Sequence, residues 1–315
     1  MARSAKTRLT RRRLLGHSLL LASSVTAFGR VFGQTRHGGL AAMPLADDLV
    51  AIRGAGANVV VLVAPDGLLM IDGGAAERSD ALLDYLAQRW PDLPVLTLFN
   101  TNWWWEHTGS NSSFAEAGAT IIAHENTKRW LAADFKVEWQ DDRAHEALPS
   151  AALPTQTVTE PGKLLFGDTI VEYGHFGNAH TDGDLYVSFP DRNVLAVSDL
   201  LAVGHYPILD YSTGGSLTGM RQAAEGLLAI ADDDTKLVPA TGPVQRRPDL
   251  VRFHELCATL EARITALIER GLTLEEVLAE RPTHDYDGRW GDPELFLTTA
   301  YKGLADRARE RREVL

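Results

Sequence analysis

Short apolar runs alternate with amphipathic segments along most of this sequence, and that alternation constrains the fold more than any other feature. The runs 58–63 and 68–71 are rich in Val, Leu and Ile and flank the turn Pro65-Asp66-Gly67, as expected of two paired strands. Residues 79–90 keep one apolar face at helical spacing, and a buried strand follows at 95–99. The second half repeats this order. Two similar halves of alternating strands and helices predict an α/β sandwich of stacked layers.

The remaining elements follow from the same periodicities and from helix-capping patterns. A Gly-rich linker is expected at 37–42, Thr273 with Glu276 forms a capping box, and Asp292-Pro293 is typical of a helix start. Further strands are predicted at 49–53, 120–123, 163–166, 169–174, 185–189, 194–197 and 236–239, and further helices near 112, at 125–133, at 217–230 and from about 250.

The first 33 residues have the pattern of a twin-arginine export signal. Arg11-Arg12-Arg13 directly precede a moderately apolar run, 14–28, and no acidic residue occurs before Asp47. The run is too short and too polar for a membrane span of about 20 residues, so no stable span is expected after cleavage. The protein is therefore predicted to be exported in folded form and to be periplasmic or secreted.

The chain after the signal is predicted to form one domain, because no linker rich in Pro, Gly or Ser divides it. We expect the sandwich at 34–245 and helices at 246–315 packed on the same domain. Removal of the seven cationic residues before Gln34 would lower the formal net charge from −11 to −18. So negative a protein repels phosphate, which argues against a nucleic-acid partner. The single cysteine, Cys257, excludes an intrachain disulfide.

Four loops at predicted strand ends hold a disproportionate share of the unusual polar residues. They are Asp72-Gly73-Gly74, 101–111, 179–184 and Ser198-Asp199. In α/β sheets, ligands bind where strand ends open into loops, so these segments locate the expected site.

The longest of these loops resembles the metal-binding motif of the metallo-β-lactamase-fold hydrolases, in particular exported members without an assigned substrate. Residues 101–111 read Thr-Asn-Trp-Trp-Trp-Glu-His-Thr-Gly-Ser-Asn. The family pattern is Thr-His-x-His-x-Asp-His-Thr-Gly-Gly-Asn. The resemblance runs from the strand pair at 58–74 through Pro243. It implies the family's four-layer αββα sandwich, here with a helical C-terminal extension.

Carried over position by position, the resemblance implies that four metal-ligand positions are retained and three are substituted. The retained set is Glu106, His107, His180 and Asp199, the substituted set is Asn102, Trp104 and Thr241, and Asp72 and Asp184 match positions that orient the ligands. An indole N–H offers a metal no lone pair and an amide is a poor zinc ligand, so the family's three-histidine site should be empty. The resemblance leaves room for one zinc or other divalent ion at most, or for none.

The aromatic residues around these positions predict how the altered site is filled. Trp104 is expected to plug the vacated metal cavity, whereas Trp103, Trp105 and His205 are candidates to line a pocket for an unknown small molecule.

Two hypotheses about function follow. In the first, the protein is an exported hydrolase of an ester, amide or lactone that keeps one metal, with Asp199 and His180 as catalytic residues. In the second, it is a metal-free pseudoenzyme that binds a small molecule or a partner protein. The sequence contains no Gly-x-Ser-x-Gly elbow and no phosphate-binding glycine loop that would indicate other chemistry.

Overall fold

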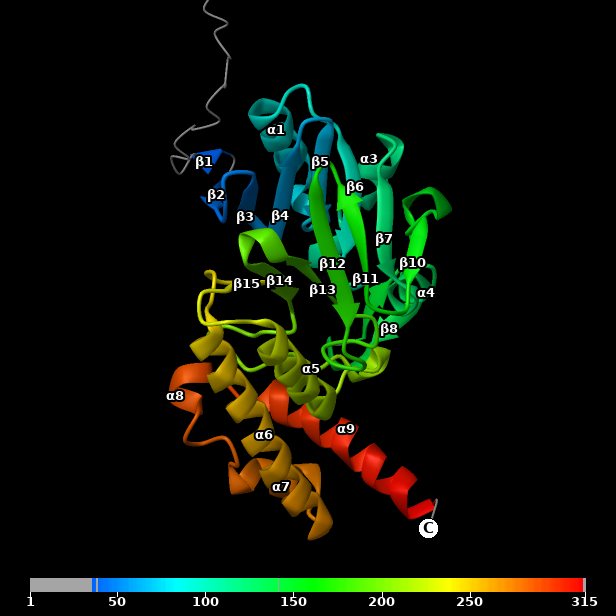
Figure 1. Cartoon of the computed structure of the whole chain (residues 1–315). Coiled ribbons are helices and arrows are strands. Elements are labelled where there is room, and N and C mark those ends of the chain that lie inside the picture. Colours follow the sequence, from blue (N-terminus) through cyan, green and yellow to red (C-terminus); the bar gives the residue numbers. More distant parts are fainter. Residues whose placement is uncertain (1–35, 38, 141, 314–315) are drawn as a thin grey trace, which may run out of the picture. The chain divides into compact units, whose positions relative to one another are not determined.

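Two β-sheets pack face to face in the computed structural model, which describes residues 36–37, 39–140 and 142–313 (Figure 1). The larger sheet has the strand order β1 (Arg36–His37), β2 (Leu40–Pro44), β3 (Leu49–Ala55), β4 (Ala57–Ala64), β5 (Gly67–Ile71), β6 (Val95–Asn100), β7 (Thr120–His124) and β10 (Gln156–Val158). The smaller sheet has the order β11 (Gly162–Phe166), β12 (Thr169–His175), β13 (Leu185–Phe189), β14 (Val194–Ser198) and β15 (Lys236–Pro239). A separate hairpin pairs β8 (Phe135–Val137) with β9 (Arg143–His145). The predicted signal peptide, 1–33, lies outside the described residues.

Helices lie along the outer faces and at the ends of the strands. The α-helices are α1 (Ser79–Arg89), α2 (Trp105–Thr108), α3 (Asn111–Glu116), α4 (Glu125–Leu131), α5 (Leu217–Ile230), α6 (Arg247–Glu269), α7 (Leu274–Glu280), α8 (Asp287–Trp290) and α9 (Glu294–Glu313). Single 3-10 turns are η1 (Ala76–Arg78), η2 (Glu138–Gln140), η3 (Ser150–Ala152), η4 (Pro190–Arg192) and η5 (Tyr211–Thr213). No helix in the described ranges is both long and apolar enough to cross a membrane.

Strand β4 explains why the sequence builds layers. Its alternate side chains Val59 and Val61 face the core under α1, whereas Val60 and Leu62 face the smaller sheet. A strand covered on both faces needs apolar residues at every position, which is why 59–63 read as a continuous run.

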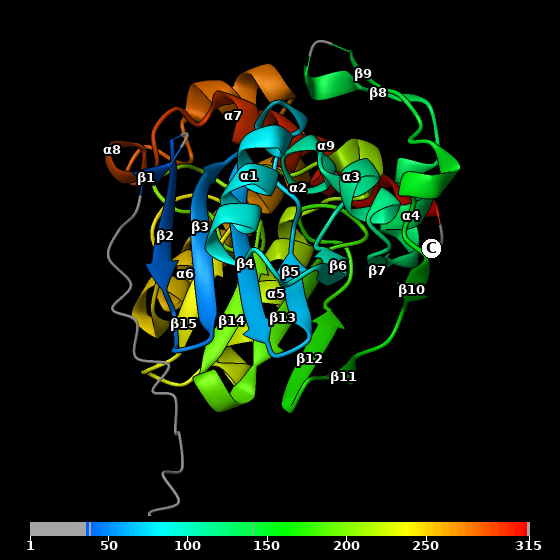
Figure 2. The ribbon, with the colours of Figure 1, turned by 90° about the horizontal axis from the view of Figure 1, so that it is seen from above.

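The outer layers complete the sandwich (Figure 2). The apolar face of α1 covers the larger sheet, and α5, α6 and α9 share a buried cluster with β14 and β15 of the smaller sheet. The predicted four-layer α/β architecture with a helical C-terminal region is therefore confirmed.

Several predicted elements match the structure closely, and one prediction is wrong. Helix α5 and strand β15 have the predicted bounds, and the Thr273 and Glu276 capping box is present at the start of α7. The expected linker at 37–42 is instead largely strand β2, which pairs with β3. Leu40 and Ala42 of this strand are buried in the core under α1, so the neighbouring glycines indicate a turn and not a linker.

Strand direction brings the polar loops to one edge of the sandwich. Strands β5, β6 and β7 are parallel neighbours, and β14 is parallel to β15. The loops after β5, β6, β14 and β15 consequently open on the same edge, where contacts between residues 72, 101 and 198 join the two sheets.

Candidate functional site

Two of the loops at this edge have unusual backbone conformations. Asp72, after β5, has a φ of 65°, and Ser198, before Asp199, has a φ of 48°. Non-glycine residues seldom adopt this left-handed region, and such positions persist only where surrounding contacts hold them. Thr101 supplies contacts to both, because its hydroxyl lies 2.8 Å from Asp72 Oδ2 and 2.7 Å from Ser198 Oγ.

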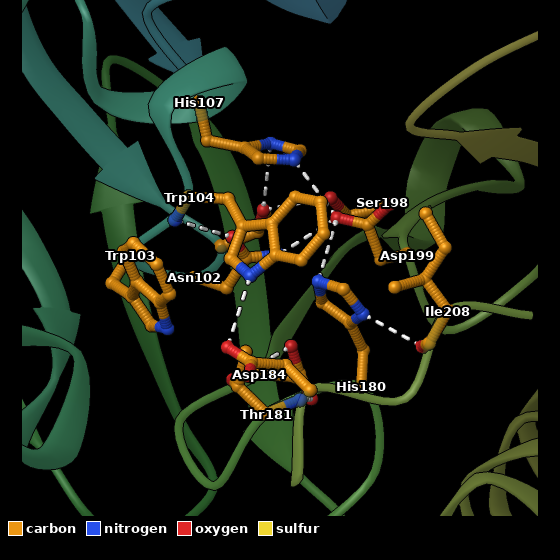
Figure 3. Close-up of polar contacts among 12 residues, drawn as sticks. Asn102, Trp103, Trp104, His107, His180, Thr181, Asp184, Ser198, Asp199 and Ile208 are labelled. Atoms are coloured by element: carbon orange, nitrogen blue, oxygen red, sulfur yellow. Dashed lines mark hydrogen bonds and ion pairs between the residues drawn. The ribbon is translucent and has the colours of Figure 1, made fainter. Parts of the chain in front are cut away.

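His107 contacts two carboxylates, those of Asp72 and Asp199. Figure 3 shows its ring directed toward Asp199. Its Nδ1 is 2.8 Å from Asp72 Oδ2, and its Nε2 is 2.8 Å from Asp199 Oδ2. Burial opposes the charged imidazolium, but the two negative charges outweigh burial and hold the pKa of His107 well above its ordinary value. With both ring nitrogens donating, His107 is a buried cation that bridges the loops after β5 and β14.

The Asp199 carboxylate accepts hydrogen bonds from two side chains of the site. Its Oδ2 accepts a 2.8 Å hydrogen bond from Asn102 Nδ2 in addition to the one from His107. Burial disfavours the carboxylate, yet the charges of His180 and His107 and these hydrogen bonds hold the pKa of Asp199 well below its ordinary value. Asn102 is itself fixed, because its Oδ1 accepts a 2.9 Å hydrogen bond from the Trp104 backbone N–H.

The indole of Trp104 fills the space beside His180. The two rings meet at an angle of 64° with centroids 4.5 Å apart, and Trp104 is buried. Trp139 of η2 stacks on Trp104 at 5.5 Å and 22°. The buried Asp210 accepts hydrogen bonds from both indoles, at 3.3 Å from Trp104 Nε1 and 2.9 Å from Trp139 Nε1. Trp104 is thus held by stacking and by a carboxylate.

His180 faces a small cavity on its other side. Its Nδ1 donates to the Ile208 carbonyl at 2.9 Å, and its buried Nε2 has no hydrogen-bond partner within the described ranges and lies 3.8 Å from Asp199 Oδ2. A cavity of about 10 Å³, lined in part by His180, Asp199, His205 and Thr241, adjoins them. This volume is that of roughly one water molecule, so it cannot take an organic substrate.

Asp184 shapes the loop that carries His180. Its carboxylate accepts hydrogen bonds from the Thr181 backbone N–H at 2.7 Å and from the Thr181 hydroxyl at 3.0 Å. Burial raises its pKa to about 7, against the opposing charge of His180 and the Thr181 hydrogen bonds. Asp184 therefore holds the backbone of the loop through Thr181. Among the described residues, no hydrogen bond joins Asp184 to the His180 ring.

The donor set does not fit a metal ion. Within the residues that the structure describes, no group of three or more His, Cys, Asp or Glu side chains is arranged to hold one. The Asp72 contact at Nδ1 is compatible with a metal-bound histidine, but Nε2 of His107 is engaged by Asp199 Oδ2, which also accepts a hydrogen bond from Asn102. Trp104, at a position that the resemblance assigns to a ligand, offers an N–H without a lone pair. Among the residues that the structure describes, Glu106 Oε2 is buried without a hydrogen-bond partner and belongs to no such group. A structural or catalytic zinc needs at least three converging protein ligands.

The structure brings some of the predicted residues together and separates others. One network of contacts joins five of the predicted residues, namely His107, His180, Asp199, Asn102 and Trp104. His205 and Thr241 lie at its rim, with His205 Nε2 3.3 Å from Thr241 Oγ1.

The pocket prediction for the outer tryptophans needs correction. Trp103 is fully buried, with its Nε1 donating to Thr213 Oγ1 at 3.1 Å, so it packs in the core and has no surface open to a ligand. Trp105 is half-buried beneath the guanidinium of Arg143, whose Cζ lies 3.6 Å from the ring centroid, and it lines neither of the two cavities described for this structure. Trp139 and Asp210 were missed, because neither falls in a motif and their contacts with Trp104 join distant segments.

Comparison with known proteins identifies the family. The family model described as the metallo-beta-lactamase superfamily matches residues 52–242. The chain belongs to the metallo-beta-lactamase superfamily. This superfamily usually binds zinc, whereas the described residues of this chain show no group of three or more His, Cys, Asp or Glu side chains placed to hold a metal.

Solved structures support the same fold. The inverting sec-alkylsulfatase Pisa1 from Pseudomonas sp. is similar with a TM-score of 0.67 and 18% identity over 84% of this chain and 50% of that one. This chain therefore spans about half the length of the alkylsulfatase. Metallo-beta-lactamases from Pontibacter korlensis and Erythrobacter litoralis have TM-scores of 0.56 and 0.55, identities of 16% and 15%, and cover 70% and 71% of this chain. The matches cover 99% and 98% of those two enzymes. At these identities, the likeness concerns the fold alone.

A histidine pair near the Asp184 loop gives a prediction about pH. His124 stacks on His175 with ring centroids 4.1 Å apart, and burial, followed by the charges of His175 and Arg129, lowers its pKa to about 4. Folding therefore favours neutral His124, and this stability is present above the ordinary pKa of 6.5 and lost as the pH falls toward 4. We expect His124→Asn, which can still cap α4, to remove about 2 kcal/mol of the acid destabilisation.

Urea unfolding at neutral and mildly acidic pH measures this difference. The exposed His284→Asn variant is the control, and its pH dependence should match that of the unmodified protein. Equal acid destabilisation of the unmodified protein and His124→Asn would show that the stacked pair does not resist protonation.

Proposed function

We propose that this protein is a metal-free member of the superfamily that binds a small molecule and does not hydrolyse one with a metal-bound hydroxide. The observation that carries the proposal is the His107 bridge, because Asp72 contacts Nδ1 and the remaining ring nitrogen, Nε2, lies 2.8 Å from Asp199 Oδ2 in place of a metal. Trp104 supports it further by occupying ligand space. The twin-arginine pattern at 1–33 supports an additional proposal, that the protein is exported and acts in the periplasm or outside the cell.

Metal content tests the proposal most directly. The mature protein, recovered after export without a tag or chelator, should contain no stoichiometric metal by mass spectrometry, and its melting temperature should not change with EDTA. The intact mass of the same sample reports whether the signal is removed. About one metal per chain, together with a melting temperature that falls on chelation, would instead support the mononuclear hydrolase with ligands from Glu106, His107, His180 and Asp199.

The triple variant Asn102→His, Trp104→His, Thr241→His provides the positive control. It restores three imidazoles around His180 and Asp199, so we expect it to take up zinc and to gain stability when zinc is added. Zinc uptake by the variant but not by the unmodified protein would show that side chains, and not the backbone frame, exclude the metal. A folded triple variant that takes up no zinc would show that the loops themselves have moved away from metal-binding geometry.

A further inference from the structure

A groove of about 570 Å³ adjoins the aromatic cluster outside the candidate metal position. Its volume lies in the range of small-molecule sites, in contrast to the single-water cavity beside His180. Three segments supply its walls: η2, η5 and the first part of α9 together with the residues before it. The lining residues are Glu138, Trp139, Tyr211, Asp292, Glu294, Leu295, Thr298 and Lys302.

Each aromatic side chain of the groove has a partner that holds it, and Trp139 shares its partners with Trp104. Trp139 stacks on Trp104 and donates to Asp210, so one indole belongs both to the plug and to the groove. Tyr211 follows Asp210 in the chain, and its hydroxyl donates to Glu138 Oε2 at 3.4 Å. The groove therefore presents aromatic rings whose positions are fixed before any ligand arrives, which reduces the entropic cost of binding.

The charges of the groove favour a cation. Glu138, Asp292 and Glu294 face one ammonium group, that of Lys302, in a chain whose net charge is already −11. Lys302 Nζ lies 4.5 Å from the centroid of Tyr211 and donates a 2.6 Å hydrogen bond to its hydroxyl oxygen, so a cation is already held at this aromatic side chain. The first backbone N–H of α9, that of Glu294, is not available to bind an anion, because it donates to Asp292 Oδ1 at 3.0 Å.

We propose that this groove binds a small organic ammonium compound. The cationic group of the ligand lies near Tyr211 and the three groove carboxylates, and its apolar part packs against Trp139 and Leu295. Leu295 is 42% exposed, which leaves apolar surface for such a ligand. The bound cation displaces the Lys302 ammonium from the Tyr211 ring. This assignment rests on the proposed binding function and names its ligand class.

Isothermal titration calorimetry of the mature protein with benzyltrimethylammonium tests the assignment, and phenylacetate serves as the anionic counterpart. We expect saturable binding of the cation and none of the anion. Lys302→Gln should tighten cation binding about 3-fold, because it removes a like charge and frees the ring, whereas Glu294→Gln should weaken it about 3-fold. Both substitutions are at exposed positions and should leave the fold intact. The exposed, distant Glu125→Gln variant is the control and should bind like the unmodified protein.

Three results would overturn the assignment: no saturable binding of the cation, cation binding that neither groove variant changes, or phenylacetate binding that Lys302→Gln abolishes. The metal content of the same preparation separates this outcome from the wider proposal. A metal-free protein without cation binding contradicts the groove alone. A metal-loaded protein whose cation binding responds to Lys302→Gln contradicts the metal-free proposal and leaves the groove standing.

Discussion

Replacing His107 by Leu is expected to lower the free energy of unfolding by about 3 to 5 kcal/mol, measured by urea denaturation near neutral pH. The substitution removes the only group that contacts both Asp72 and Asp199 within hydrogen-bond distance among the described ion pairs. The side chain of Asp72 is 2% exposed, so water cannot replace the lost cation there. Asp72 is then left as a buried carboxylate without its cation, whereas Asp199, whose side chain is 24% exposed, is partly solvated. The uncompensated charge at Asp72 is the costly outcome of breaking a buried ion pair.

A charge-balanced variant separates this effect from lost packing. Asp72→Asn, His107→Leu and Asp199→Asn together leave no uncompensated charge, so the triple variant should be more stable than His107→Leu alone. The exposed His205→Leu variant is the control and should change stability by less than about 0.5 kcal/mol. A loss below about 1 kcal/mol for His107→Leu, or a triple variant that is less stable than the single one, would contradict the bridge.

Much of the fold could be predicted because its elements carry strong periodicities. The run at 59–63 identifies a strand buried on both faces, and the bounds of α5 are those predicted from its apolar spacing. Strand β2 was misassigned because neighbouring glycines outweighed a short alternation at Leu40 and Ala42. The hairpin β8–β9 was missed because three-residue strands carry too few alternations to be distinguished from loop.

The site was predictable by position but not by chemistry. The motif predicted that His107, His180 and Asp199 lie at strand ends, and the structure places both histidines within 3.8 Å of the Asp199 carboxylate. The motif could not indicate that His107 would bridge two carboxylates, because that depends on Asn102 donating to Asp199 and on the joint position of two loops. Asp210 was invisible for the same reason. A buried carboxylate outside any motif can be recognised only in the structure, from the indole N–H groups of Trp104 and Trp139 that donate hydrogen bonds to it.

Trp104→Ala is expected to destabilise the protein by about 3 to 5 kcal/mol, the range for removing a large buried ring from a packed site. The ring contacts His180 and Trp139, and its loss also leaves Asp210 Oδ2 with one donor fewer. Trp104→Phe keeps most of the packing and loses only the 3.3 Å hydrogen bond, so its cost should be about 1 kcal/mol.

The neighbouring Trp105 supplies a matched control, since it is the same residue type but half-buried. Trp105→Ala loses the Arg143 contact and the edge contact with Trp103, but the ring is partly solvated, so it should cost less than Trp104→Ala in the same denaturation assay. If Trp104→Ala costs no more than Trp105→Ala, the ring lies at an open mouth and does not plug the site. Zinc binding by the Trp104→Ala protein would be a separate outcome, and we do not expect it, because opening the space adds no lone pair to the donor set.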